Sequence, residues 1–194
     1  LETWEVLAAH PERLAEVPGL RPAVGEALHA YARDHRKLAQ LASLLRKGGI
    51  GPATARRAYE FYRARGADPV EVATADPFQV ARDVDRIGFE KADRIAEAVG
   101  LPRDAAPRIR AGLRHVLQRA AEQSGHCFLP ADELIRDASR LLSLPPERVE
   151  PELRAMADDA LELLQPDRVC LEAEAVYLAP LLEAERSIAE RVRA

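Results

Sequence analysis

Residues 48–59, GGIGPATARRAY, contain the pattern that decides the fold. Gly49 and Gly51 stand one residue apart, directly before a segment in which apolar residues have helical spacing. A tight turn at this place needs the backbone freedom of glycine. Proline at the first position of a helix loses no hydrogen bond and already has a helical φ. We therefore predict a helix, a tight turn at the glycines, and a second helix that begins at Pro52.

The same pattern occurs three times in the first half of the chain, which indicates an internal repeat. The segments are PGLRPAVGEAL from Pro18, GGIGPATARRAY from Gly48 and DRIGFEKADRIA from Asp85. Superposing the turns brings Gly25, Ala55 and Ala92 into register, six residues after the first turn position. A small residue at this position lets the second helix pack closely on the first. The repeat predicts tandem helix-hairpin-helix motifs.

The rest of the chain has a different pattern. We expect an amphipathic helix from Pro107, a short strand in 126–130, helices in 131–144 and 145–159, and two short strands within 161–180. This order is typical of a winged helix. The predicted fold class is mainly α, with tandem helix-hairpin-helix repeats followed by a winged-helix-like unit with a small β-hairpin. The predicted domains are 1–100 (tandem helix-hairpin-helix region), 101–123 (connecting helix), 124–179 (winged-helix-like domain) and 180–194 (closing helix).

The formal net charge of −4 is unevenly distributed over the 194 residues. Residues 33–65 hold nine basic and two acidic side chains, whereas residues 130–194 hold eight basic and fifteen acidic ones. The first segment suits a polyanion and the second repels it.

Unsatisfied amides and the helix dipole make a helix N-terminus an anion site. Glycine leaves the approach open, and a nearby arginine adds charge-assisted hydrogen bonds. Such contacts bind phosphate and do not read bases, so we predict non-sequence-specific DNA binding. The candidate DNA-binding residues are Gly49, Gly51, Ala53, Thr54, Arg56 and Arg57 in the middle repeat, Arg86, Gly88 and Lys91 in the third, and Gly19 and Arg21 in the first.

Other kinds of site are not expected. The chain has no GxxxxGK[ST] motif, and its histidines and two cysteines lack metal-ligand spacing. We expect no catalytic residue, cofactor or metal in this fragment, and we interpret Cys127 and Cys170 as buried thiols. No apolar run reaches the roughly 20 residues that cross a bilayer, and no signal peptide is recognisable. A cytoplasmic location with no membrane partner is expected.

Several stretches together resemble a known family. They are LAEVPGL, GGIGPATARRAY, DPFQVARDVDRIGFEKADRIAEAVGL, RIRAGLRHVL, SGHCFLPADEL and VYLAPLLEAERSIAERV. In this order they resemble the N-terminal region of stand-alone bacterial RecD-like ATP-dependent DNA helicases, which are exodeoxyribonuclease V α-subunit-like. The resemblance implies a parent 5′–3′ helicase in DNA repair or recombination. It also implies ATP and Mg²⁺ in a motor domain after residue 194, and that motor as a partner.

Two functions stay open at this stage. The first is a DNA-binding module that contacts the backbone of single-stranded or forked DNA. The second is a protein-interaction scaffold that docks the motor or a repair partner without touching DNA. Residues 146–159, the second helix of the winged-helix-like unit, have a local charge of −3. This charge disfavours DNA, so we expect that unit to dock onto protein.

Overall fold

The computed structural model describes residues 10, 12–15, 17–18, 20–158 and 168–193. The chain divides into two compact units, Leu1–Gly100 and Leu101–Ala194. The elements of the first unit are α2 (Glu12–Ala15), α3 (Pro22–Lys47), α4 (Pro52–Ala64), α5 (Pro69–Ala75), α6 (Pro77–Asp83) and α7 (Phe89–Val99). Helices predominate, and a small sheet lies in the second unit, so the predicted fold class is confirmed.

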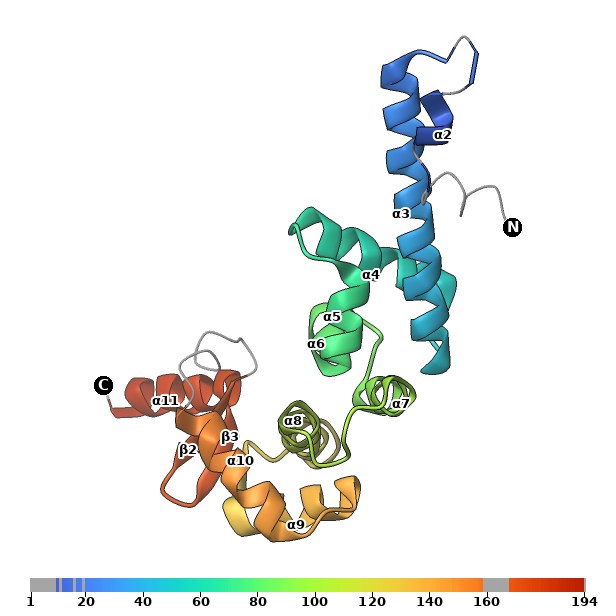
Figure 1. Cartoon of the computed structure of the whole chain (residues 1–194). Coiled ribbons are helices and arrows are strands. Elements are labelled where there is room, and N and C mark those ends of the chain that lie inside the picture. The colour runs from blue at the N-terminus through green and yellow to red at the C-terminus, as the bar shows by residue number, and fades with distance from the viewer. Residues whose placement is uncertain (1–9, 11, 16, 19, 159–167, 194) are drawn as a thin grey trace. The chain divides into compact units, whose positions relative to one another are not determined.

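The described part of the first unit contains three helical hairpins, α2 with α3, α3 with α4, and α6 with α7, together with the short helix α5 (Figure 1). The residue before the second helix of each hairpin is Arg21, Gly51 or Gly88. All three have extended backbones, with ψ of 139°, 163° and 172°. This conformation is usual before a helix, and the second and third repeats share a further feature, a positive φ at Gly49 and Arg86. Ala55 and Ala92, at the small-residue position, are fully buried.

The turn between α3 and α4, here called the glycine turn (residues 48–51), closes with bonds back onto α3. The amides of Gly48 and Ile50 both donate to the carbonyl of Leu45, at 3.0 and 3.2 Å, and Gly49 donates to Arg46 at 2.9 Å. Gly49 has a φ of +74°, a conformation that glycine adopts without steric cost. Pro52 then begins α4, as predicted.

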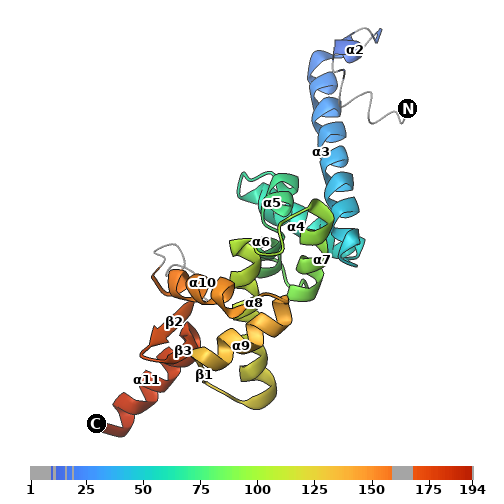
Figure 2. The ribbon, with the colours of Figure 1, turned by 60° about the horizontal axis from the view of Figure 1, so that its bottom comes forward.

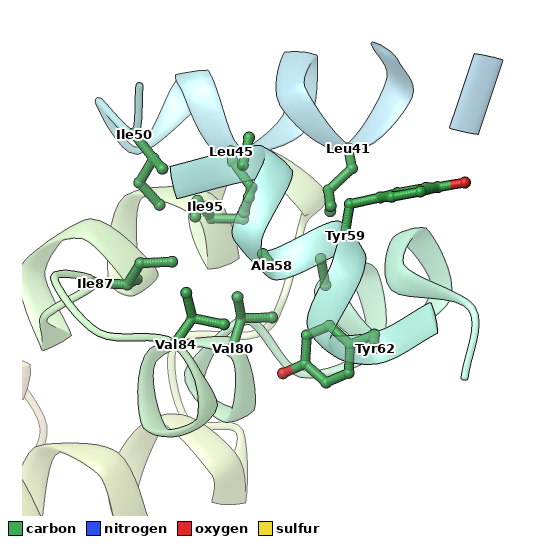
Figure 3. Packing of buried hydrophobic residues seen from close by; sticks show 12 residues of the cluster. Leu41, Leu45, Ile50, Ala58, Tyr59, Tyr62, Val80, Val84, Ile87 and Ile95 are labelled. Atoms are coloured by element: carbon green, nitrogen blue, oxygen red, sulfur yellow. The ribbon is translucent and has the colours of Figure 1, made fainter. Parts of the chain in front are cut away.

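The turn between α6 and α7, here called the arginine turn (residues 85–88), has the same form with different residues. Arg86 has a φ of +71° and occupies the position of Gly49. Ile87 occupies the position of Ile50 in the repeat, and each of the two residues is 4% exposed. Their side chains enter one hydrophobic cluster with Leu45 and Ile95 (Figure 3). Both turns are therefore anchored in the same core.

The two hairpins approach each other closely at Gly48. A Cβ on this residue would lie 2.5 Å from the carbonyl oxygen of Lys91 and 2.8 Å from a side-chain carbon of Ile95. No side chain fits there, so only glycine lets the glycine turn pack against α7. The sequence pattern assigned the turn glycines a conformational role and missed this packing role.

Polar contacts connect the remaining helices of the first unit. The hydroxyl of Tyr62 on α4 donates to the carboxylate of Asp83 on α6 at 2.8 Å. Burial raises the pKa of Tyr62, and the hydrogen bond to Asp83 adds to the rise, so the hydroxyl stays protonated. Asp76 begins α6 by accepting bonds from the amides of Phe78 and Gln79.

The second unit contains α8 (Ala106–Ser124), β1 (Phe128–Pro130), α9 (Ala131–Leu142), α10 (Pro146–Asp158), β2 (Val169–Glu172), β3 (Ala175–Leu178) and α11 (Ala179–Arg193). The strands form an antiparallel sheet in the order β1-β3-β2, seen with α11 in Figure 2. This is the element order expected of a winged helix. Helix α8, which the sequence analysis treats as a connector, packs on α9 and α10, and its residues Ile109 and Leu113 are buried. The four predicted domain boundaries stay a prediction.

The prediction of two buried thiols is wrong. Cys127 is exposed, and Cys170 is half-buried. Cys127 precedes β1, outside the apolar alternation of the strand. The carboxylate of Glu185 beside it raises the pKa of the thiol.

We predict that Gly48→Ala destabilises the first unit. The added methyl must displace the backbone carbonyl of Lys91, and overpacking of this kind costs about 1–3 kcal/mol. The matched control is Gly25→Ala in α3, where the nearest atom would be 3.7 Å away. Removing a helical glycine there should raise stability by up to about 1 kcal/mol. Urea unfolding followed by circular dichroism measures both; equal effects would refute the packing role of Gly48.

We also predict an acid-dependent loss of stability from Asp68, the N-cap of α5. The ammonium of Lys37 on α3 and the amides of Val70 and Glu71 bind its carboxylate. The Lys37 contact is the main reason that the pKa lies below its ordinary 3.8. Because the folded pKa is the lower one, the stabilisation is complete above pH 3.8 and is lost as the pH falls through the folded pKa.

Asp68→Asn is the variant that isolates this effect. Asparagine is also a good N-cap, so the bonds to the α5 amides are kept while the ionisable group is removed. Urea midpoints of wild type and variant should converge as the pH falls toward the acid range. A constant difference at all pH values would contradict the assignment.

Candidate nucleic-acid interface

The N-terminus of α4 is an open site for an anion. Gly51 and Ala53 are exposed and Thr54 is half-buried. Within the described residues, the first amide of α4 that donates to a backbone carbonyl is that of Ala55, which bonds to Gly51 at 3.1 Å. The amides before it point out of the helix end, where no helical acceptor exists. Among the described residues, nothing lies within 4 Å of a Cβ placed on Gly51.

Basic side chains surround this helix end. Arg56 and Arg57 are exposed in its first turns, and Arg46 and Lys47 are exposed at the end of α3. Within the described ranges none of these four forms an ion pair; Arg57 contacts only the Thr54 hydroxyl, at 3.4 Å. The first turn of α4 contains no acidic residue. The positive charge of these four side chains is therefore available to a ligand.

The arginine turn offers a less open site. Gly88 has open space around it in the described part of the chain, as Gly51 does. However, the ammonium of Lys91 donates to the carbonyl of Arg86 at 3.0 Å, and Glu90 lies in the first turn of α7. An anion at α7 meets a carboxylate nearby and a lysine already engaged with the turn.

Arg94 is a candidate that the sequence analysis missed. It is exposed on α7, and its guanidinium lies 3.9 Å from the position of a Cβ on Gly49. The packing of Gly48 on α7 brings this arginine to the glycine turn. Superposing the second and third repeats pairs Arg94 with Arg57. This register is the one feature of the sequence that could have indicated Arg94.

The first repeat lies apart from the other two. Gly19 is outside the described residues. Arg21 is exposed at the start of α3, and the glycine turn follows the end of the same helix. At 26 residues, α3 is roughly 39 Å long. The structure brings the candidates of the second and third repeats together, and Arg21 does not join them.

The described residues form neither a metal-binding cluster nor a membrane-spanning helix. No group of three or more His, Cys, Asp or Glu side chains is placed to hold a metal ion. Among the same residues, no helix is both long and apolar enough to cross a bilayer.

We predict that inorganic phosphate binds at the N-terminus of α4. In amide NMR spectra, the signals of Ala53 and Thr54 should shift saturably with phosphate, because their N–H groups lie at the positive end of the helix dipole. The amide of Ala55 is the internal control, since its acceptor is Gly51. Chloride at equal ionic strength controls for screening. Shifts of the same size throughout the first unit would contradict a local site.

The comparisons with known proteins agree with this geometry. Residues 34–128 match the family model described as the ATP-dependent RecD2 DNA helicase HHH domain. The chain is 26% identical over 200 residues to the ATP-dependent RecD2 DNA helicase of Deinococcus radiodurans. That alignment covers 98% of this chain and 27% of the relative, so the chain spans about a quarter of the relative's length. Residues 34–128 thus match a helix-hairpin-helix domain of the RecD2 type, and the two comparisons support the expectation that the chain is an N-terminal fragment of a RecD-like DNA helicase.

Proposed function

We propose that this chain is a non-sequence-specific DNA-binding module of an ATP-dependent 5′–3′ helicase that acts in repair or recombination. The observation that supports it best is the open N-terminus of α4, flanked by arginines that have no ion-pair partner among the described residues. The RecD2 match supports the helicase context. This conclusion is favoured over a scaffold without DNA contact, because a scaffold gives no reason to keep these groups unpaired.

The binding mode follows from the donors present. A phosphate oxygen at the glycine turn accepts from the amides of Ala53 and Thr54. Arg57, and Arg94 from the neighbouring hairpin, supply charge-assisted bonds worth about 1.5–3 kcal/mol each before desolvation. None of these donors reads a base edge, so the module holds a strand without selecting its sequence.

The chemical step belongs to another part of the parent protein in this proposal. ATP and Mg²⁺ would bind in a motor domain, which the chain contacts as a partner. Tethering to that motor raises the effective concentration of DNA at this module, so weak intrinsic binding is sufficient. The module then restrains the strand while the motor moves along it.

The winged-helix-like unit is proposed to dock onto protein. Both arginines of α10 are engaged: Arg148 with Asp104 at 2.5 Å and Arg154 with Glu150 at 2.5 Å. Glu152 of α10 binds Arg110 of α8 at 3.0 Å. A helix with occupied cations and further carboxylates is a poor ligand for a DNA groove, and the motor domain is the partner we favour.

We predict salt-dependent DNA binding by the 194-residue chain. If about four phosphates are engaged, log K should fall against log salt with a slope of about −3 to −4. Fluorescence anisotropy with labelled oligonucleotides of unrelated sequences measures the slope and the lack of base preference. Binding that is indifferent to salt would contradict backbone recognition.

Two variants locate the interface. Gly51→Val should weaken binding to all sequences alike, because the branched side chain blocks the approach to the α4 amides. Arg56→Glu with Arg57→Glu should weaken it by at least about tenfold, since two donors are lost and two repulsive charges are added. Arg191→Glu with Arg193→Glu on α11 is the control with the same change in net charge. Equal effects of the two double variants would show that only total charge matters.

A further inference from the structure

A groove of about 330 Å³ lies between α3 and α4 and adjoins the site at the glycine turn. Its lining residues are His35, Leu38, Ala39 and Ala42 from α3 and Pro52, Ala53 and Arg56 from α4. Ala53 belongs to both features: its amide is in the open first turn of α4, and its side chain lines the groove. A ligand that occupies the groove is therefore adjacent to an anion at the helix end.

The groove continues along α3 as a stripe of apolar and aromatic side chains. Tyr31, His35, Ala39 and Ala42 recur at helical spacing, so they share one face of α3. The Tyr31 ring is 58% exposed, and its centroid lies 6.2 Å from that of His35. From Tyr31 to Ala42 the stripe is roughly 16 Å long. This length accommodates several stacked nucleotides at about 3.4 Å each.

The charges around the groove favour an anionic occupant. Arg56 forms part of the wall, and Arg46 lies one helical turn beyond Ala42 on the same face of α3. Neither arginine has an ion-pair partner among the residues that the structure describes, and the lining contains no acidic side chain. The nearby carboxylate of Asp34 is neutralised by Arg63 on α4, at 2.5 Å. An occupant with a flat apolar part and an attached anion fits these features.

We propose that the groove binds an unpaired base of single-stranded DNA whose phosphate lies at the N-terminus of α4. This inference rests on the proposed function and adds to its backbone contacts a site for a base. In a duplex the faces of a base are covered by its neighbours, so a base enters a protein groove only when it is unstacked. Aromatic and apolar side chains that contact bases in this way are typical of single-strand binding. The substrate is a single strand or the unpaired arm of a fork.

The test compares three labelled probes by anisotropy with the full 194-residue chain. They are a short single strand of mixed sequence, the corresponding duplex, and a single strand of equal length and charge made of abasic sites. Because base contacts add to the phosphate contacts, the ordinary strand should bind about tenfold more tightly than the abasic strand. It should also bind more tightly than the duplex at the same salt concentration.

Two substitutions locate the base contact. Ala39→Leu fills the groove and should remove the preference for the ordinary strand, while the affinities for abasic strand and duplex stay unchanged. Tyr31→Ala should reduce the same preference. Ala30→Leu is the matched control, since residue 30 is exposed on the opposite face of α3. Equal thermal unfolding midpoints for the two leucine variants show that Ala39→Leu leaves the fold intact.

The outcomes separate this inference from the proposed function. Equal binding of ordinary and abasic strands, tighter binding of duplex, or an Ala39→Leu variant with unchanged binding overturns the base groove. In those cases, sensitivity to Arg56→Glu with Arg57→Glu still supports the phosphate site. Absence of binding to all three probes overturns both. Loss of the base preference in Ala39→Leu alone supports the groove.

Discussion

The contact between the backbone of Gly48 and the carbonyl of Lys91 is the constraint on which the first unit depends. It brings the glycine turn against α7, and this places Ile50 and Ile87 in one core (Figure 3). It also brings Arg94 beside Gly49. The donors of the proposed interface therefore come from two hairpins, and their spacing is set by a backbone contact that has no adjustable side chain.

Much of this arrangement could be predicted from local rules. Glycines before Pro52 indicated the turn and the start of α4, and the repeat of small residues indicated the buried Ala55 and Ala92. Arg86 shows the limit of these rules. It adopts the left-handed conformation expected of glycine, because the core contact of Ile87 and the Lys91 bond determine the shape of the turn.

The parts that could not be predicted depend on packing between helices that are separate in sequence. Arg94 lies beside the glycine turn because Gly48 packs against α7. The groove likewise depends on how α3 and α4 pack within their hairpin. Cys127 was predicted to be buried, and it is exposed. Counts of charge located the surplus of basic residues in 33–65. These counts could not show which arginines form ion pairs within the chain. Both arginines of α10 do so.

The hydrogen bond from Lys91 to the Arg86 carbonyl makes the two turns chemically unequal. An anion that arrives at α4 meets amides and guanidinium groups that are ready to bind it. At α7, the same anion gains the lysine only by breaking an existing bond, and it does so beside Glu90. Under the proposed function, we therefore expect an anion to occupy the α4 turn before the α7 turn as ligand concentration rises, although the two turns have nearly the same shape.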